Sequence, residues 1–109
     1  MSRYLFIESR DAFESRDNRF VEETAVALQQ RGHEVTIFLL QNGVLSARRN
    51  GNENYLGRLA GAGVTMMADD FSLRERGIQP AELTAGIRQS NIEALVDALV
   101  EENTKAIWH

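Results

Sequence analysis

The chain has 109 residues, a net charge of −4 and no cysteine, and its length suits one domain with its own core. The negative charge disfavours nucleic acid as a partner, because such binding requires a basic surface. The lack of cysteine excludes disulfides and thiolate chemistry. The two histidines, His33 and His109, are too few and too far apart in sequence to indicate a zinc site. We therefore expect no metal and no cofactor.

The N-terminal segment and the lengths of the apolar runs bear on location. The apolar residues Leu5, Phe6 and Ile7 are followed at once by Glu8 and Arg10, which is unlike a signal peptide. No apolar run approaches the ~20 residues that a membrane-spanning helix needs. These features favour a cytoplasmic protein with no membrane association.

The first half of the chain predicts strands and helices in alternation: a strand over residues 3–8, a helix over 18–31, a strand over 33–40, a short helix over 44–49 and a helix over 55–62. The first strand is apolar from Tyr4 to Ile7, which is typical of a parallel strand buried on both faces. The second strand ends at Gln41-Asn42-Gly43, a turn signal. Asn42 is expected to cap the short helix that follows.

The second half continues this alternation: a strand over residues 64–68, a short helix from 72, a turn with a helix start near 80, a short strand over 86–89, a helix over 90–103 and a last strand over 105–108. The spacings Ser72-x-x-Glu75 and Ser90-x-x-Glu93 are those of capping boxes, so Ser72 and Ser90 are expected as helix caps. In the long helix the apolar residues recur at helical spacing. We expect it to bury Ile92, Leu95, Val96, Leu99 and Val100.

Together these elements predict a single three-layer α/β/α domain over residues 1–109, with a five-stranded, mostly parallel sheet. In open α/β sheets, ligands bind at the carboxyl ends of the strands. Polar residues that follow those ends, or adjoin the helices there, are therefore the candidate pocket residues: Ser9, Arg10, Arg16, Gln41, Asn42, Asp69, Asp70 and Arg76.

Two kinds of role fit the adjacent carboxylates Asp69 and Asp70. They could bind a hard cation or act as a general acid–base pair. Alternatively, one caps a helix and the other is solvated, which is favoured because successive residues leaving a strand point in different directions. Arg10 and Arg16 could hold an anion near the first helix, or pair with acidic neighbours on the surface, which is again the favoured interpretation.

Three features resemble the DsrE/DsrF-like family of sulfur-relay proteins: the strand that ends in Gln41-Asn42-Gly43-Val44, the strand–turn unit that ends in Arg76-Gly77, and the strand that finishes the chain. The resemblance covers essentially the whole chain. It implies the family's fold, with the second strand at the centre of the sheet, and a homo-oligomer such as a dimer, trimer or hexamer.

The same resemblance bears on activity. In catalytic members a cysteine just after the third strand carries a persulfide between partner proteins, and the match places Asp69 at that position. A persulfide requires a nucleophilic sulfur, so persulfide transfer is not expected here.

Two functional hypotheses follow. In the first, the chain is a non-catalytic, cysteine-free family member that acts as an oligomeric binding or partner protein, with Val44, Leu45 and Trp108 as candidate contact residues. In the second, it is an enzyme that acts on a small anionic substrate through Asp69 or Asp70.

Overall fold

The computed structural model describes residues 2–10, 18–48 and 53–109. Its five strands form one sheet in the order β4-β3-β2-β1-β5, and all four pairings are parallel. The strands are β1 (Arg3–Glu8), β2 (Glu34–Leu39), β3 (Thr65–Asp69), β4 (Ile87–Ser90) and β5 (Thr104–Trp108). The predicted five-stranded sheet is confirmed, and β2 lies at its centre, as the family resemblance implied.

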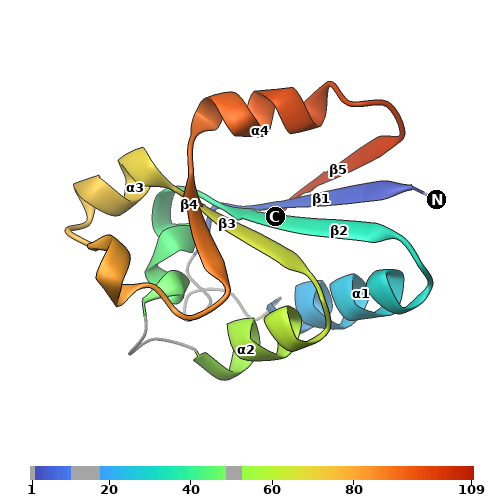
Figure 1. Ribbon diagram of the computed structural model, residues 1–109, viewed down its shortest axis with the longest axis horizontal. Helices are drawn as coiled ribbons and strands as arrows, with labels where there is room; N and C mark the ends of the chain where they lie inside the picture. The colour runs from blue at the N-terminus through green and yellow to red at the C-terminus, as the bar shows by residue number, and fades with distance from the viewer. Residues whose placement is uncertain (1, 11–17, 49–52) are drawn as a thin grey trace.

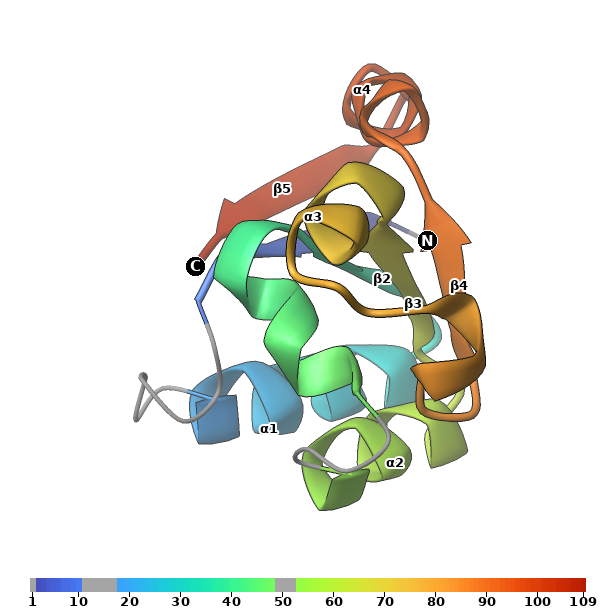
Figure 2. The ribbon, with the colours of Figure 1, turned by 90° about the vertical axis from the view of Figure 1, so that its left-hand side faces the viewer.

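Helices lie on both faces of this sheet (Figure 1). Helices α1 and α2 cover one face and α4 lies over the other, while η1 and α3 sit at the carboxyl ends of the strands, towards the viewer in Figure 2. The helical elements are α1 (Asn18–Gln30), the 3₁₀ helix η1 (Gln41–Ala47), α2 (Glu53–Gly61), α3 (Asp70–Glu75), the 3₁₀ helix η2 (Pro80–Glu82) and α4 (Ile92–Leu99). Within the described residues, no helix has the length and apolar character needed to cross a membrane.

The two faces of the sheet carry cores of unequal size. Beneath α1 and α2, the large core includes Phe6, Ile37, Leu56, Leu59 and Met66. The α4 face has a small buried core made of Leu5, Ile7, Phe38, Leu40 and Leu95. One helix of eight residues therefore covers a face that spans five strands.

Helix α4 corrects the sequence-based expectation most clearly. Of its five apolar residues expected to be buried, only Leu95 is, with 4% of its surface exposed. The others are exposed: Ile92 by 53%, Val96 by 51%, Leu99 by 41% and Val100 by 77%. The helix packs on the sheet through Leu95 and Ala98, so a second apolar stripe on the same helix is left facing outwards.

The predicted helix caps also need correction. Helix α3 begins at Asp70 with Asp69 as its N-cap, instead of at Ser72. The N-cap of α4 is Asn91, whose Oδ1 accepts a hydrogen bond from the Ala94 N–H at 2.9 Å, instead of Ser90. In both cases an Asp or Asn side chain one to three residues from the expected serine reaches the free N–H groups of the first turn, which is the usual role of these residues.

Asn42 does not cap η1, as the sequence had suggested. The N-cap position of η1 is Leu40, with no side-chain hydrogen bond, and Asn42 lies inside the first turn. Its side chain is instead engaged by Arg76, so the amide serves a contact between two segments of the chain.

Candidate functional site

The centre of the strand-end site is the contact between Asp69 and Ser72. Asp69 Oδ2 accepts hydrogen bonds from the Ser72 backbone N–H at 3.0 Å and from the Ser72 hydroxyl at 2.7 Å. Both residues are buried. The carboxylate therefore holds the first turn of α3 and the side chain of Ser72 in place.

The same serine connects α3 to the end of β2. Ser72 Oγ accepts a hydrogen bond from the backbone N–H of Gln41 at 2.9 Å. Gln41 has a φ of 51°, a left-handed conformation that residues other than glycine seldom adopt. The chain Gln41–Ser72–Asp69 thus ties together the turns that follow β2 and β3.

Arg76 makes a second link between the same two turns. Its Nε and Nη2 donate to Asn42 Oδ1 at 3.2 and 3.0 Å, and its Nη1 donates to the Ser72 carbonyl at 3.2 Å. The structure therefore brings four of the predicted pocket residues together: Gln41, Asn42, Asp69 and Arg76.

The second carboxylate, Asp70, turns to a different partner. Its Oδ2 lies 3.4 Å from Nη1 of Arg74, one turn along α3, whereas Asp69 bonds to Ser72. In the described part of the chain, no group of three His, Cys, Asp or Glu side chains could hold a metal ion. The local contacts of the two aspartates are those of a helix cap and a surface ion pair.

The remaining candidates lie beyond the end of β1. Ser9 donates its backbone N–H to the carbonyl of His109 at 3.1 Å, so it joins the ends of β1 and β5. Arg10 is exposed. Arg16 lies outside the described residues, so its expected place on the rim stays a prediction.

One buried acid at this edge of the sheet was missed from the sequence. Glu8 is only 6% exposed, its Oε1 lies 3.0 Å from His109 Nδ1, and its Oε2 is buried without a hydrogen-bond partner. Burial raises the pKa of Glu8, and the nearby His109 partly opposes that rise. The alternation of side chains along a strand could have predicted this burial, since Glu8 lies two residues after Phe6 and its side chain points to the same buried face.

Comparison with known proteins decides the family. The DsrE/DsrF-like family matches residues 2–105 of the chain. The chain belongs to the DsrE/DsrF-like family. A search of curated proteins finds no match.

Solved structures share the DsrE-like fold at low sequence identity. MTH1491 of Methanobacterium thermoautotrophicum has a TM-score of 0.82 at 19% identity and covers 100% of both chains. The ychN protein of E. coli has a TM-score of 0.82 at 16% identity, covering 98% of this chain and 100% of its own. BT1422 of Bacteroides thetaiotaomicron has a TM-score of 0.77 at 16% identity, with coverage of 97% and 94%.

Family membership gives the position of Asp69 a particular meaning. From the sequence resemblance we expect this residue at the position of the cysteine of catalytic members, and in the structure it is the last residue of β3 and the N-cap of α3. A short aspartate side chain at an N-cap accepts hydrogen bonds from the free N–H groups of the first turn. The carboxylate at this position stabilises the helix locally.

Proposed function

We propose that this DsrE/DsrF-like protein is a non-catalytic, sulfur-relay-related family member that works as a homo-oligomeric binding or partner protein. The observation that carries the proposal is the unpaired apolar stripe of α4, formed by Ile92, Val96, Leu99 and Val100, which we call the outer stripe. Two further arguments support it: the chemistry at Asp69 and the exposure of Trp108.

The non-catalytic part rests on the chemistry of Asp69. Persulfide transfer needs a thiolate that attacks a sulfane sulfur, and the chain has no cysteine. The carboxylate that stands in the cysteine position is buried and bonded to Ser72. A carboxylate held in this way has neither the sulfur nor the accessibility that the transfer requires.

The oligomeric part rests on the outer stripe. Its residues stand at positions i, i+4, i+7 and i+8, so they form one continuous strip along α4. Leu95 and Ala98, on another side of this helix, already pack against the sheet. A helix with apolar residues on both its inner and outer sides is characteristic of one that is covered on both sides.

Trp108 is a further exposed apolar residue on the face of the sheet that α4 covers. Its side chain is on the α4 face, because it is the register partner of Ile7, which packs in the core under α4. Five of the seven large hydrophobic residues exposed in the described part of the chain belong to α4, its C-cap or Trp108. Exposed apolar residues gathered on one side of a protein mark interaction sites, and a second copy of the chain is the partner we propose.

The contact residues differ in part from those expected from the sequence. Trp108 is 64% exposed and available. Val44 is fully buried inside the chain, so it cannot contribute to a contact surface. It packs in the core because η1 folds back over the carboxyl ends of the strands.

Light scattering at micromolar concentration tests the assembly. We expect a mass that is a multiple of 12.3 kDa, and the Val96→Glu variant should shift it to the monomer because a charge in the stripe opposes burial. Phe20→Glu is the matched control, since Phe20 is 56% exposed on α1, over the other face. A monomeric wild-type protein would contradict the oligomer, and an unchanged Val96→Glu assembly would contradict this surface.

A mass measurement tests the absence of persulfide chemistry. After incubation with a persulfide donor, we expect no gain of a sulfur atom, while a thiol peptide in the same reaction gains one. A stoichiometric gain on the protein would overturn the non-catalytic assignment.

The alternative enzyme gains no specific support from the geometry. Asp69 is bonded to Ser72 and Asp70 is paired with Arg74, so the two carboxylates do not converge on a shared substrate position. We therefore do not propose it as a second function.

A further inference from the structure

A cavity lies between α4 and the sheet, away from the strand-end site. Its volume is about 470 Å³, within the range of about 300–1,000 Å³ that is usual for small-molecule sites. It exists because a single short helix spans this face and touches the sheet at Leu95 and Ala98. The cavity has no part in the function proposed above.

The walls of the cavity combine apolar surface with hydroxyl groups. Leu5, Phe38 and Met67 form an apolar floor on β1, β2 and β3, and the small side chains Ala94 and Ala98 of α4 lie opposite. Three threonines also line it: Thr36, Thr65 and Thr104. Thr36 and Thr65 are register partners on neighbouring strands, and Thr104 Oγ1 is buried without a hydrogen-bond partner.

Some of the charged side chains that line the cavity form ion pairs with each other, and others do not. Arg3 already forms two ion pairs: its Nε lies 2.8 Å from Glu34 Oε2, and its Nη1 lies 3.0 Å from Glu101 Oε2. Arg88 on β4 and Asp97 on α4 also line the cavity. Neither forms an ion pair with the other or with any other charged group among the described residues.

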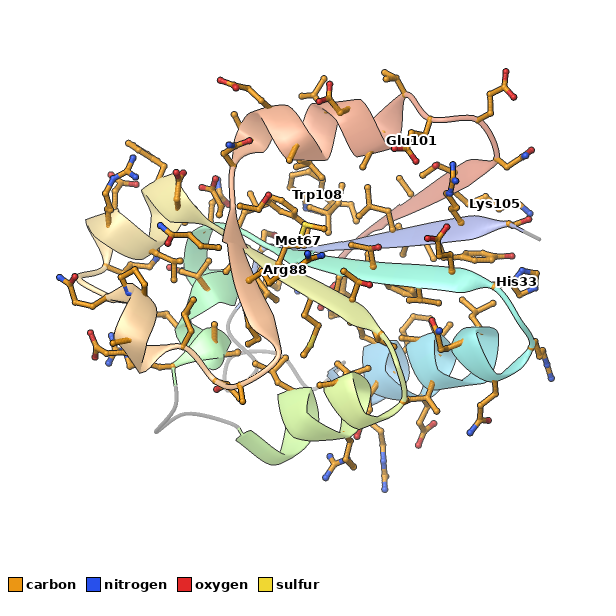
Figure 3. The ribbon with its side chains drawn as sticks, in the orientation of Figure 1. His33, Met67, Arg88, Glu101, Lys105 and Trp108 are labelled. Carbon is orange, nitrogen blue, oxygen red and sulfur yellow. The ribbon has the colours of Figure 1, made fainter. Side chains whose placement is uncertain are left out.

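The two uncommitted charges stand on opposite walls. Arg88 is the register partner of Met67, and Figure 3 shows these two side chains close together on the sheet side of the space below α4. Asp97 belongs to the helix on the other side. A ligand between them meets a cation on one wall, a carboxylate on the other and an apolar floor at Met67 and Phe38.

We propose that this cavity binds a free α-amino acid with an apolar side chain. The planar guanidinium of Arg88 suits the ligand carboxylate, which it can bind with two parallel hydrogen bonds. Asp97 accepts from the ammonium group, and the apolar side chain lies against Phe38 and Met67. A purely anionic ligand fits less well, because Glu34, Asp97 and Glu101 all line the same cavity.

The test is a titration of the full-length protein with L-phenylalanine, followed by NMR chemical shifts. We expect saturable shifts at residues of the cavity. 3-Phenylpropionate lacks the ammonium group and 2-phenylethylamine lacks the carboxylate, so each should bind at least about tenfold more weakly, as expected for the loss of a charged hydrogen bond. No saturation up to about 10 mM, a range that already corresponds to very weak binding, would overturn the site.

Variants connect the binding to the named residues. Arg88→Gln and Asp97→Asn should each weaken L-phenylalanine binding at least about tenfold, and Ala98→Phe should abolish it by filling the space. Arg19→Gln is the matched control, because Arg19 is an exposed arginine on α1 and should leave binding unchanged. Arg88 and Asp97 are exposed, so thermal unfolding should confirm that their variants fold. An affinity for L-phenylalanine equal to that of the wild type in either Arg88→Gln or Asp97→Asn, or binding of 3-phenylpropionate as tight as that of L-phenylalanine, would show that the zwitterion assignment is wrong.

Discussion

Gly43 packs directly against the carbonyl group of Glu8. A Cβ atom at residue 43 would overlap the Glu8 carbonyl oxygen and lie 2.9 Å from the carbonyl carbon. The same oxygen accepts a hydrogen bond from the Leu40 N–H at 3.0 Å. The turn after β2 therefore sits on the end of β1, which brings η1 over the carboxyl edge of the sheet (Figure 2).

This contact predicts a strong effect of a single methyl group. Gly43→Ala should destabilise the protein by about 1–3 kcal/mol, because the obstacle is backbone and cannot move aside. Gly57→Ala is the control, since Gly57 lies in α2 with no atom near its Cβ position. That change should stabilise the protein by about 0.5–1 kcal/mol through the helix preference of alanine. Urea unfolding measures both, and equal effects would contradict the close approach.

The Asp69 cap predicts a loss of stability without a loss of fold. Asp69→Ala should cost about 1–3 kcal/mol, because it removes the N-cap of α3 and leaves the buried hydroxyl of Ser72 without its acceptor. Asp70→Ala should cost less than about 1 kcal/mol, since it removes only a surface pair with Arg74 and a charge near the helix start. Chemical denaturation measures the stability of both variants. A larger loss of stability for Asp70→Ala than for Asp69→Ala would show that Asp69 is not the N-cap of α3.

Helix α4 and the turn that follows it predict unequal effects of two substitutions. Leu95→Ala should destabilise by about 2–5 kcal/mol, because Leu95 is buried between the helix and the sheet. Glu101→Ala should change stability by less than about 1 kcal/mol, because its bond to Arg3 is exposed. Thermal unfolding of the two variants decides this, and similar losses would mean that α4 does not pack through Leu95.

Glu8 predicts a pH dependence of stability. Burial raises its pKa in the folded protein above the value of about 4.3 in an unfolded chain. Between these two values the folded state binds more protons, so this group's contribution to stability is complete below about pH 4.3 and declines as the pH rises to the folded pKa. The decline follows from the cost of a buried charge, which a neutral side chain does not have.

Glu8→Gln isolates this contribution, since it keeps the shape and removes the charge. The stability of the wild type relative to the variant should fall as the pH rises above about 4.3. Urea midpoints between pH 4 and pH 7 measure the difference, with Glu93→Gln as an exposed control on α4. A relative stability that rises with pH would show that the bond to His109 outweighs burial.

Local sequence patterns determined where each strand begins and ends along the chain. The apolar runs and the turns that bound them predicted all five strands to within about two residues, because strand alternation and turn chemistry are encoded by neighbouring residues. Gly32 and Gly63, which follow the predicted helices over 18–31 and 55–62, take positive φ angles, and such a glycine after a helix is also a local requirement of the backbone. The family motifs at Gln41–Val44 and Arg76-Gly77 are short and local in the same way.

Only the tertiary structure decided which polar and apolar groups are paired. The bond between Glu8 and His109 joins residues 101 positions apart, and the Arg76–Asn42 contact joins residues 34 positions apart. The apolar pattern of α4 showed that the helix needs cover but not that the sheet reaches only Leu95 and Ala98. Burial depends on how many elements arrive over a given face, and that number follows from the order in which the strands assemble, which no local pattern contains.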